Sequence, residues 1–276
     1  MIKKIFFLVP LVLIGSVLSG TPEPFRQRVY SANTPSSPQE TSYETETRFG
    51  RNLAARILNR YKSLEDKQVT RYVSLVGTAI TAQFGIPELH YYFIVLDMPQ
   101  VNAYACPGGY IFLTKGALAA MKNEAQLVGV LAHEIAHINR RHVIRKLNVP
   151  DNVEDLVGDV GQVIGSQTST ARVAMNQFLD EAITLLFEEG IGKQEELEAD
   201  SDAVLMIGAL NYDWKHYLEY IKQLKPIYDD SETKMSKTHP SIGDRLNRIT
   251  VSSRKLGHSR IPPKTHAQRF NTYVQL

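Results

Sequence analysis

The segment LVGVLAHEIAHI, residues 127–138, is apolar apart from His133, Glu134 and His137. Its leucine, valine and isoleucine residues recur at helical spacing, which predicts a buried helix. Two histidines four residues apart project from one face of that helix, one turn from each other. Polar side chains in an otherwise apolar helix are costly unless they have partners. The pattern therefore predicts a buried helix whose polar face serves a chemical purpose.

Two imidazole nitrogens on one helix face can bind a single Zn²⁺ at about 2.0–2.1 Å each. Glu134 lies about 100° round the helix from His133, beside the metal but off the ligand positions. From there its carboxylate can take the proton of a water that attacks a carbonyl. HExxH on a helix is typical of metallopeptidases with these roles. We expect one zinc ion per chain, bound by His133 and His137, with Glu134 as general base.

A catalytic zinc site needs a third protein ligand and an open position. A third histidine six residues after the second is excluded, because position 143 is Val. His142 stands five residues after His137, so on a continuous helix it points off the ligand face. We expect it either on the surface or behind a ligand, and not on the metal.

A carboxylate from another helix is the other standard third ligand. The acidic segment EELEAD, residues 195–200, supplies several candidates. Glu196 and Asp200 stand four apart on one helix face, so one can bind zinc while the other holds a histidine Nδ1–H. The pattern alone leaves Glu195 and Glu198 open as ligands, although a solvated acidic face explains both.

The N-terminus predicts export. Residues 1–20 contain two lysines, an apolar run and then small residues, which is the anatomy of a secretory signal peptide. The apolar run, residues 5–18, is shorter than the about 20 residues that span a membrane. The alternative is an uncleaved inner-membrane anchor with the lysines inside. Residues 21–45 are expected to form a linker. Both interpretations place the body of the protein in the periplasm, the second with membrane association through the N-terminus.

Charge and cysteine content exclude other classes. The net charge is only +2 and no basic cluster is present, so nucleic acid is not an expected partner. Cys106 is the single cysteine, without a signature for a nucleophile around it. We interpret it as a small apolar strand residue. No pattern in the sequence indicates an oligomeric state.

The remaining patterns predict an α+β fold that is mostly helical, with a small antiparallel sheet and the HExxH helix at its centre. The domain is expected over residues 46–250, followed by an extended tail over 251–276. Glycines in 150–193 predict two helices joined by mobile joints, which we interpret as a lid over the site. The other expected elements are helices within 46–84, strands at 91–96, 101–105 and 110–113, and helices at 123–146, 194–210, 213–225 and 241–250.

Four motifs in this order carry a resemblance to a known family. They are VNAYACPGGYIFLTKGAL (101–118), HEIAH (133–137), ELEAD (196–200), and Thr238-His239-Pro240-Ser241 with Arg245. Together they resemble the HtpX/BepA-type gluzincin zinc metallopeptidases, which are related to the Ste-type CAAX proteases. The resemblance implies a zincin-like peptidase fold over about residues 45–250. The chain resembles short, stand-alone periplasmic members, because neither further membrane helices nor tetratricopeptide repeats follow the motifs.

The resemblance assigns roles to the motif residues. It implies that Glu196 is the third zinc ligand and that Asp200 supports a ligand histidine.

Upstream, it implies that Asn102 and Ala103 lie on an edge strand that pairs with an extended substrate. His239 resembles a histidine that approaches the metal, either steadying the oxyanion or capping the zinc in a closed state. Arg245 is expected to orient His239 or Glu196.

The function expected from the motifs and the resemblance is zinc-dependent hydrolysis of peptide bonds. The resemblance implies unfolded or misfolded envelope proteins as substrates, in protein quality control. The alternative is a non-catalytic or latent periplasmic chaperone or scaffold on the same fold. An intact Glu134 argues against that alternative, because a closed structural metal site has no use for a general base.

Overall fold

The computed structural model describes residues 43–149, 169–226, 240–256 and 262–276. The expected signal peptide, nearly all of the expected linker, and His239 lie outside the described residues. Within the described ranges, none of the helices combines the length and the apolar character that crossing a membrane requires.

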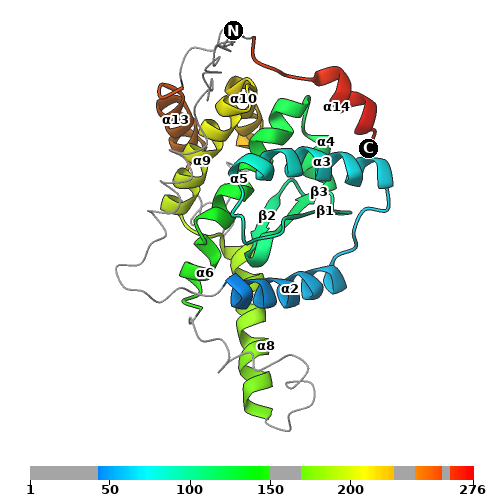
Figure 1. The fold of residues 1–276 in the computed structure, drawn as a ribbon, viewed down its shortest axis with the longest axis vertical. Coiled ribbons are helices and arrows are strands. Elements are labelled where there is room, and N and C mark those ends of the chain that lie inside the picture. The colour runs from blue at the N-terminus through cyan, green and yellow to red at the C-terminus, as the bar shows by residue number, and fades with distance from the viewer. Residues whose placement is uncertain (1–42, 150–168, 227–239, 257–261) are drawn as a thin grey trace, which may run out of the picture.

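The described part of the chain is mostly helical, around one small sheet (Figure 1), which confirms the expected α+β class. The strands are β1 (Tyr92–Leu96), β2 (Ala103–Cys106) and β3 (Tyr110–Thr114). The helices are α2 (Tyr43–Arg60), α3 (Lys67–Phe84), α4 (Lys115–Ala119), α5 (Glu124–Asn139), α6 (His142–Lys146), α8 (Ser169–Thr184), α9 (Lys193–Ala209), α10 (Trp214–Gln223), α13 (Ile242–Ser253) and α14 (Ala267–Tyr273), with single turns η1 (Pro107–Gly109) and η2 (Leu185–Glu189).

The sheet has the order β1-β3-β2 and is mixed, so the expectation of an antiparallel sheet is wrong in part. β2 and β3 form an antiparallel hairpin across η1, as the Pro-Gly-Gly turn predicts. β1 pairs with β3 in parallel. The chain reverses once between β1 and β2 and again across η1, so β3 runs in the direction of β1. Because β3 lies in the middle, β2 is left at an edge of the sheet.

Both faces of the sheet are buried, which explains the nearly continuous apolar strands. One face packs against α3 and α5, and the other packs against α2 and η2. The first face presents Phe93, Val95, Ala105, Ile111 and Leu113, and the second presents Leu96, Tyr104, Cys106 and Phe112. The expectation of a buried strand residue at Cys106 is confirmed.

Helix α5 runs through the centre of the molecule, between the sheet and the helices α9 and α10 (Figure 1). Every one of its residues is buried. It begins at the expected cap, where the Asn123 side chain accepts a hydrogen bond from the Gln126 N–H at 3.0 Å. A helix enclosed in this way holds the polar residues of its last two turns in fixed positions.

The expected helix 123–146 is interrupted, because α5 ends at Asn139 and α6 begins at His142. Arg141 adopts φ 53°, a left-handed conformation that a continuous helix does not permit. Ion pairs fix the break on both sides. Arg140 binds Glu198 and Asp202 of α9, and Arg141 binds Glu46 of α2 at 2.7 Å. The break changes the direction in which His142 points.

The expectation of an extended tail after residue 250 is wrong in two places. Helix α13 continues to Ser253, and α14 forms over Ala267–Tyr273. Phe270 of α14 is 2% exposed and Arg269 pairs with the buried Glu124 at the start of α5. The tail is helical because it gains an apolar contact and a buried ion-pair partner on the body.

Only the second half of the region 150–193 lies among the described residues, and it is helical as expected. α8 contacts α2 through Arg56, which bonds Asn176 and Asp180. The turn η2 then leads through Gly190 (φ 78°) and Gly192 (φ 141°) into α9. These two backbone conformations favour glycine, and they lie where the chain passes from η2, which contacts β2, into α9.

Candidate metal centre

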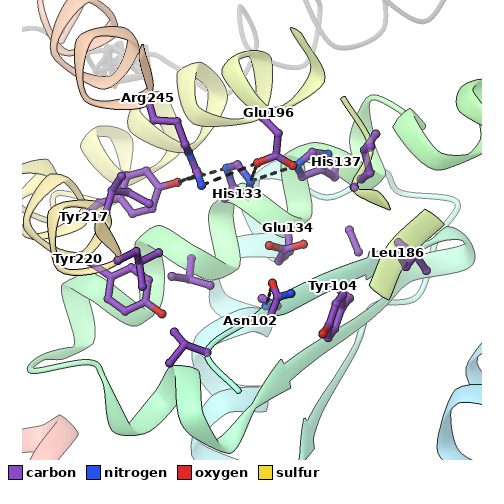
Figure 2. Close-up of a pocket in the computed structure, with 18 residues that line it drawn as sticks. Asn102, Tyr104, His133, Glu134, His137, Leu186, Glu196, Tyr217, Tyr220 and Arg245 are labelled. Atoms are coloured by element: carbon purple, nitrogen blue, oxygen red, sulfur yellow. Dashed lines mark hydrogen bonds and ion pairs between the residues drawn. The ribbon is translucent and has the colours of Figure 1, made fainter. Parts of the chain in front are cut away.

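Three side chains from two helices converge at the centre of the molecule (Figure 2). His133 and His137 come from α5, and Glu196 comes from α9, whose packing against α5 is extensive. Their ligand-type atoms all lie within 4.8 Å of one another, and all three residues are buried. The structure therefore brings together the two histidines and the carboxylate that the spacing and the resemblance selected.

The separations within this donor group match a tetrahedral ion. The two histidine Nε2 atoms lie 3.1 Å apart. Glu196 Oε2 lies 3.4 Å from His133 Nε2, and Glu196 Oε1 lies 3.5 Å from His137 Nε2. Ligand atoms at about 2.0–2.1 Å from a tetrahedral zinc are about 3.3 Å from one another. The donor types and separations of the three residues thus suit a zinc ion, with either oxygen of Glu196 available as the ligand.

Asp200 supports His133 from behind. Its Oδ1 lies 3.1 Å from His133 Nδ1, on the side of the ring opposite the donor group. Arg245 of α13 binds both oxygens of Asp200, at 2.8 Å and 2.7 Å, while its Nη1 lies 3.8 Å from Glu196. Burial alone would raise the pKa of the Asp200 carboxyl, but Arg245 holds that pKa well below its usual range. Arg245 therefore acts mainly on Asp200 and only secondarily on Glu196.

Tyr217 of α10 completes this group, and no sequence pattern indicated it. Its hydroxyl donates to Asp200 Oδ1 at 2.7 Å and lies 3.2 Å from His133 Nδ1. The ring packs directly on Gly129 of α5, where a Cβ would lie 2.4 Å from ring atom Cδ2. Position 129 thus needs glycine for close approach, and that glycine, one turn before His133, was the available signal.

The spacing of His142 predicts a place off the metal, either on the surface or behind a ligand, and the break before α6 gives it a buried position. Its Nδ1 lies 2.8 Å from His137 Nδ1, and the residue is 1% exposed. Of the two expected places, the structure selects the one behind a ligand. Glu198 lies 3.5 Å from His142 and binds Arg140, so the interpretation of Glu198 as a freely solvated acid is wrong.

Glu134 points into the space between the donor group and Asn102, as Figure 2 shows. Its side chain lines the cleft and only 7% of the residue is exposed. Burial raises the pKa of Glu134 to about 7, against the opposing effect of His133. A carboxyl group with such a pKa is suited to accept and return a proton near neutral pH.

A cleft runs past Glu134 along the free edge of β2. Residues 101–105 form one wall, and residues of α10 and of the η2–α9 connection form the other. Asn102 lies one residue before β2, and Ala103 is the first residue of the strand. Thr114 N–H bonds the Asn102 carbonyl, so the alternation of the ladder turns the backbone groups of Ala103 and Ala105 away from β3, toward the cleft.

The Asn102 side chain occupies part of this edge. Its Oδ1 accepts a hydrogen bond from the Ala103 N–H at 2.9 Å. Farther along β2, Phe187 of η2 stacks on Tyr104 with ring centroids 4.1 Å apart. Side chains therefore border this edge at both ends, and Ala105 between them is 2% exposed.

A zincin-like metallopeptidase domain is the class that this fold and donor group define. The comparison with family models agrees, since residues 67–252 match peptidase family M48. The chain belongs to peptidase family M48.

Several curated relatives are similar to this chain. The Beta-barrel assembly-enhancing protease of Yersinia pestis is 25% identical over 190 residues, which is 66% of this chain and 38% of that protein. Its counterpart in Escherichia coli (strain K12) is 24% identical over 189 residues, with the same coverage. Mitochondrial metalloendopeptidase OMA1 of Schizosaccharomyces pombe is 30% identical over 186 residues, 65% of this chain and 52% of that protein. The matched region thus spans from 38% to 52% of the length of these relatives.

Proposed function

We propose that this protein is a zinc-dependent endopeptidase that hydrolyses peptide bonds in extended polypeptide chains. One observation carries the proposal, namely the position of Glu134 between the donor group His133, His137 and Glu196 and the free edge of β2. A metal site, a proton acceptor and a strand edge for a substrate backbone therefore meet in one cleft. A structural metal site would need neither the acceptor nor the cleft.

The two histidines and Glu196 would hold one zinc ion. Zinc bound there would polarise the scissile carbonyl and lower the pKa of a water toward about 7. The choice of zinc rests on the donor chemistry, since two imidazoles and one carboxylate at tetrahedral spacing suit this ion.

The other residues of the site transfer the proton and hold the ligands in place. Glu134 takes the proton of the attacking water and later passes it to the leaving amine. Asp200 accepts from His133 Nδ1–H and so presents Nε2 to the metal, and Arg245 fixes Asp200. We also propose that His239, which lies outside the described residues, approaches this group from the segment before α13 and steadies the oxyanion.

Substrates would enter as extended segments that pair with the backbone of Ala103 and Ala105. Folded domains offer few such segments, so unfolded or misfolded proteins are the proposed substrate class. The signal-like N-terminus would place them in the bacterial envelope, with periplasmic localisation or inner-membrane anchoring. The similarity to proteins named Beta-barrel assembly-enhancing protease supports the proposed peptidase activity, and that name connects those relatives with β-barrel assembly.

The proposal is tested with the full chain and β-casein, an unfolded protein, as the probe. Wild type should cleave casein, and Glu134→Gln should lose cleavage while it retains one zinc per chain. Glu181→Gln is the matched control, because Glu181 is exposed on α8, away from the cleft. Wild type that binds zinc but leaves casein intact would favour the chaperone or latent alternative. Cleavage by Glu134→Gln at the wild-type rate would exclude the assigned base.

A further inference from the structure

His142 lies directly behind a proposed zinc ligand. Its Nδ1 is 2.8 Å from His137 Nδ1, and the two rings meet edge to face with an interplanar angle of 74°. The residue is 1% exposed, so this contact is made inside the protein. A histidine buried at hydrogen-bond distance from another histidine needs a defined arrangement of protons, because two bare nitrogens or two N–H groups would repel each other.

The direction of the hydrogen bond follows from the donor group. His137 Nε2 faces His133 Nε2 at 3.1 Å and Glu196 at 3.5 Å. A neutral imidazole that binds a metal through Nε2 carries its proton on Nδ1. His137 therefore donates from Nδ1, and His142 Nδ1 must accept.

The second nitrogen of His142 then carries the proton of that ring. Nε2 of His142 lies 3.5 Å from Oε2 of the Glu198 carboxylate, which is an electrostatic contact without a hydrogen bond. Glu198 is itself held by Arg140 at 2.9 Å and by Gln194 at 3.0 Å. The Nε2–H of His142 thus lies near an anchored anion, which favours this tautomer electrostatically.

The backbone break between α5 and α6 creates this contact. On a continuous helix, a residue five positions after His137 would point away from it. The left-handed conformation of Arg141, held by its ion pair with Glu46, redirects the chain so that His142 returns to His137. Each histidine of the donor group therefore has its own buried partner, Asp200 for His133 and His142 for His137.

We propose that His142 is a positioning residue for the metal site. It fixes the ring orientation of His137 and the tautomer that presents Nε2, through the contact of 2.8 Å between the two Nδ1 atoms. The inference rests on the zinc site of the proposed function and extends it by one residue. Partners of this kind contribute about 10- to 100-fold to metal affinity.

The test measures zinc affinity in the full chain. The zinc dissociation constant is determined by competition with a chromogenic chelator for wild type, His142→Ala and His142→Gln. The visible absorption of bound Co²⁺ reports the ligand geometry of each. Val143→Ala is the matched control, because Val143 is 4% exposed on the same helix and carries no polar group. Thermal unfolding of the zinc-free proteins measures the purely structural cost.

We expect about 10- to 100-fold weaker zinc binding in His142→Ala, with altered Co²⁺ bands. His142→Gln should lose less zinc affinity, because the glutamine amide oxygen can accept a hydrogen bond from His137 Nδ1–H. Val143→Ala should lower the unfolding temperature but leave zinc affinity unchanged.

The proposal would be overturned if His142→Ala bound zinc within about twofold of the wild-type affinity, because partners of this kind contribute more than that. An equal loss of zinc affinity in Val143→Ala would also overturn it. So would a failure of both His142 variants to fold under conditions in which Val143→Ala folds. A wild-type protein that binds zinc tightly but cleaves no casein would contradict the proposed peptidase activity. It would leave the proposed role of His142 in zinc binding unaffected.

Discussion

Arg245 holds both oxygens of Asp200, at 2.8 Å and 2.7 Å, and neither residue is more than 6% exposed. The pair joins α13 to α9 beside the donor group, and Arg245 also lines the cleft. Because both charges are buried, each depends on the other for its stability. The pair therefore connects the stability of the fold to the geometry of the metal site.

Replacing Arg245 with Met should destabilise the protein by about 3–5 kcal/mol, because it leaves the Asp200 carboxylate buried without its counter-charge. Urea unfolding monitored by circular dichroism measures this change. The double variant Arg245→Met with Asp200→Leu should recover part of the loss, since it removes the unpaired charge as well. A double variant less stable than the single one would contradict the assignment.

Metal binding should stabilise the folded chain, since the donor group is assembled from α5 and α9 only when the protein folds. Free zinc at about 1,000 times its dissociation constant should add about 4 kcal/mol to the free energy of unfolding. The unfolding temperature measured with zinc and with a chelator gives the shift. Glu196→Ala is the comparison, and in that variant the shift should shrink strongly; an undiminished shift would place the ion elsewhere.

Gly129→Ala should disturb the metal site by displacing Tyr217, which packs on this glycine. The added Cβ would lie 2.4 Å from the Tyr217 ring, which must move away from Asp200 and His133. Overpacking of this kind costs about 1–3 kcal/mol, more than the about 1 kcal/mol that alanine gains in a helix. Both unfolding temperature and casein cleavage should fall.

Gly243→Ala is the matched control for this substitution. A Cβ at position 243 would meet only the Ser241 hydroxyl at 3.6 Å, so this variant should be neutral or slightly stabilised. Equal losses in the two glycine variants would show that the Tyr217 contact is not the cause.

Glu124 should make stability depend on pH. This buried carboxylate receives hydrogen bonds from Tyr72, Tyr212 and Arg269. Burial alone would raise the pKa of Glu124, but these partners lower it below its ordinary value. A lowered folded-state pKa gives stability that is present above the unfolded pKa, about 4.3, and is lost as pH falls through the folded pKa.

Glu124→Gln should therefore be less stable than wild type at pH 7, by about 1.5–3 kcal/mol. The difference should begin to narrow as pH falls below the unfolded-state pKa of about 4.3, and it should narrow further until the folded-state carboxyl is protonated. Thermal unfolding across this range measures it. Asp97→Asn, which breaks a largely exposed pair with Lys115, is the control and should cost at most about 1 kcal/mol. A Glu124→Gln difference that is constant with pH would contradict the ionised state.

The sequence predicted most of the helices, and the reason is local. Helical periodicity and a cap such as Asn123 depend on residues within one or two turns of each other. The same holds for the pair His133 and His137, whose common face follows from their spacing. Glu196 and Asp200 were selected together for the same reason, although the sequence alone left Glu195 and Glu198 open as ligands.

Errors arose where a distant residue decided the local conformation. The break at Arg141 depends on Glu46, and the helix at 267–273 depends on the burial of Phe270 and on Glu124. The parallel pairing of β1 with β3 follows from the order of strands in the sheet, which no single strand specifies. Periodicity carries no information about such partners.

By itself, the sequence determined the chemistry that this protein can offer, namely two imidazoles and a general base on one helix and a carboxylate on another. The tertiary structure alone decided how these groups are supported. Tyr217 reaches Asp200 and His133 because α10 packs on Gly129, and His142 reaches His137 because the chain breaks between α5 and α6. Residue spacing sets directions within one helix, whereas contacts between helices depend on the packing of the whole core.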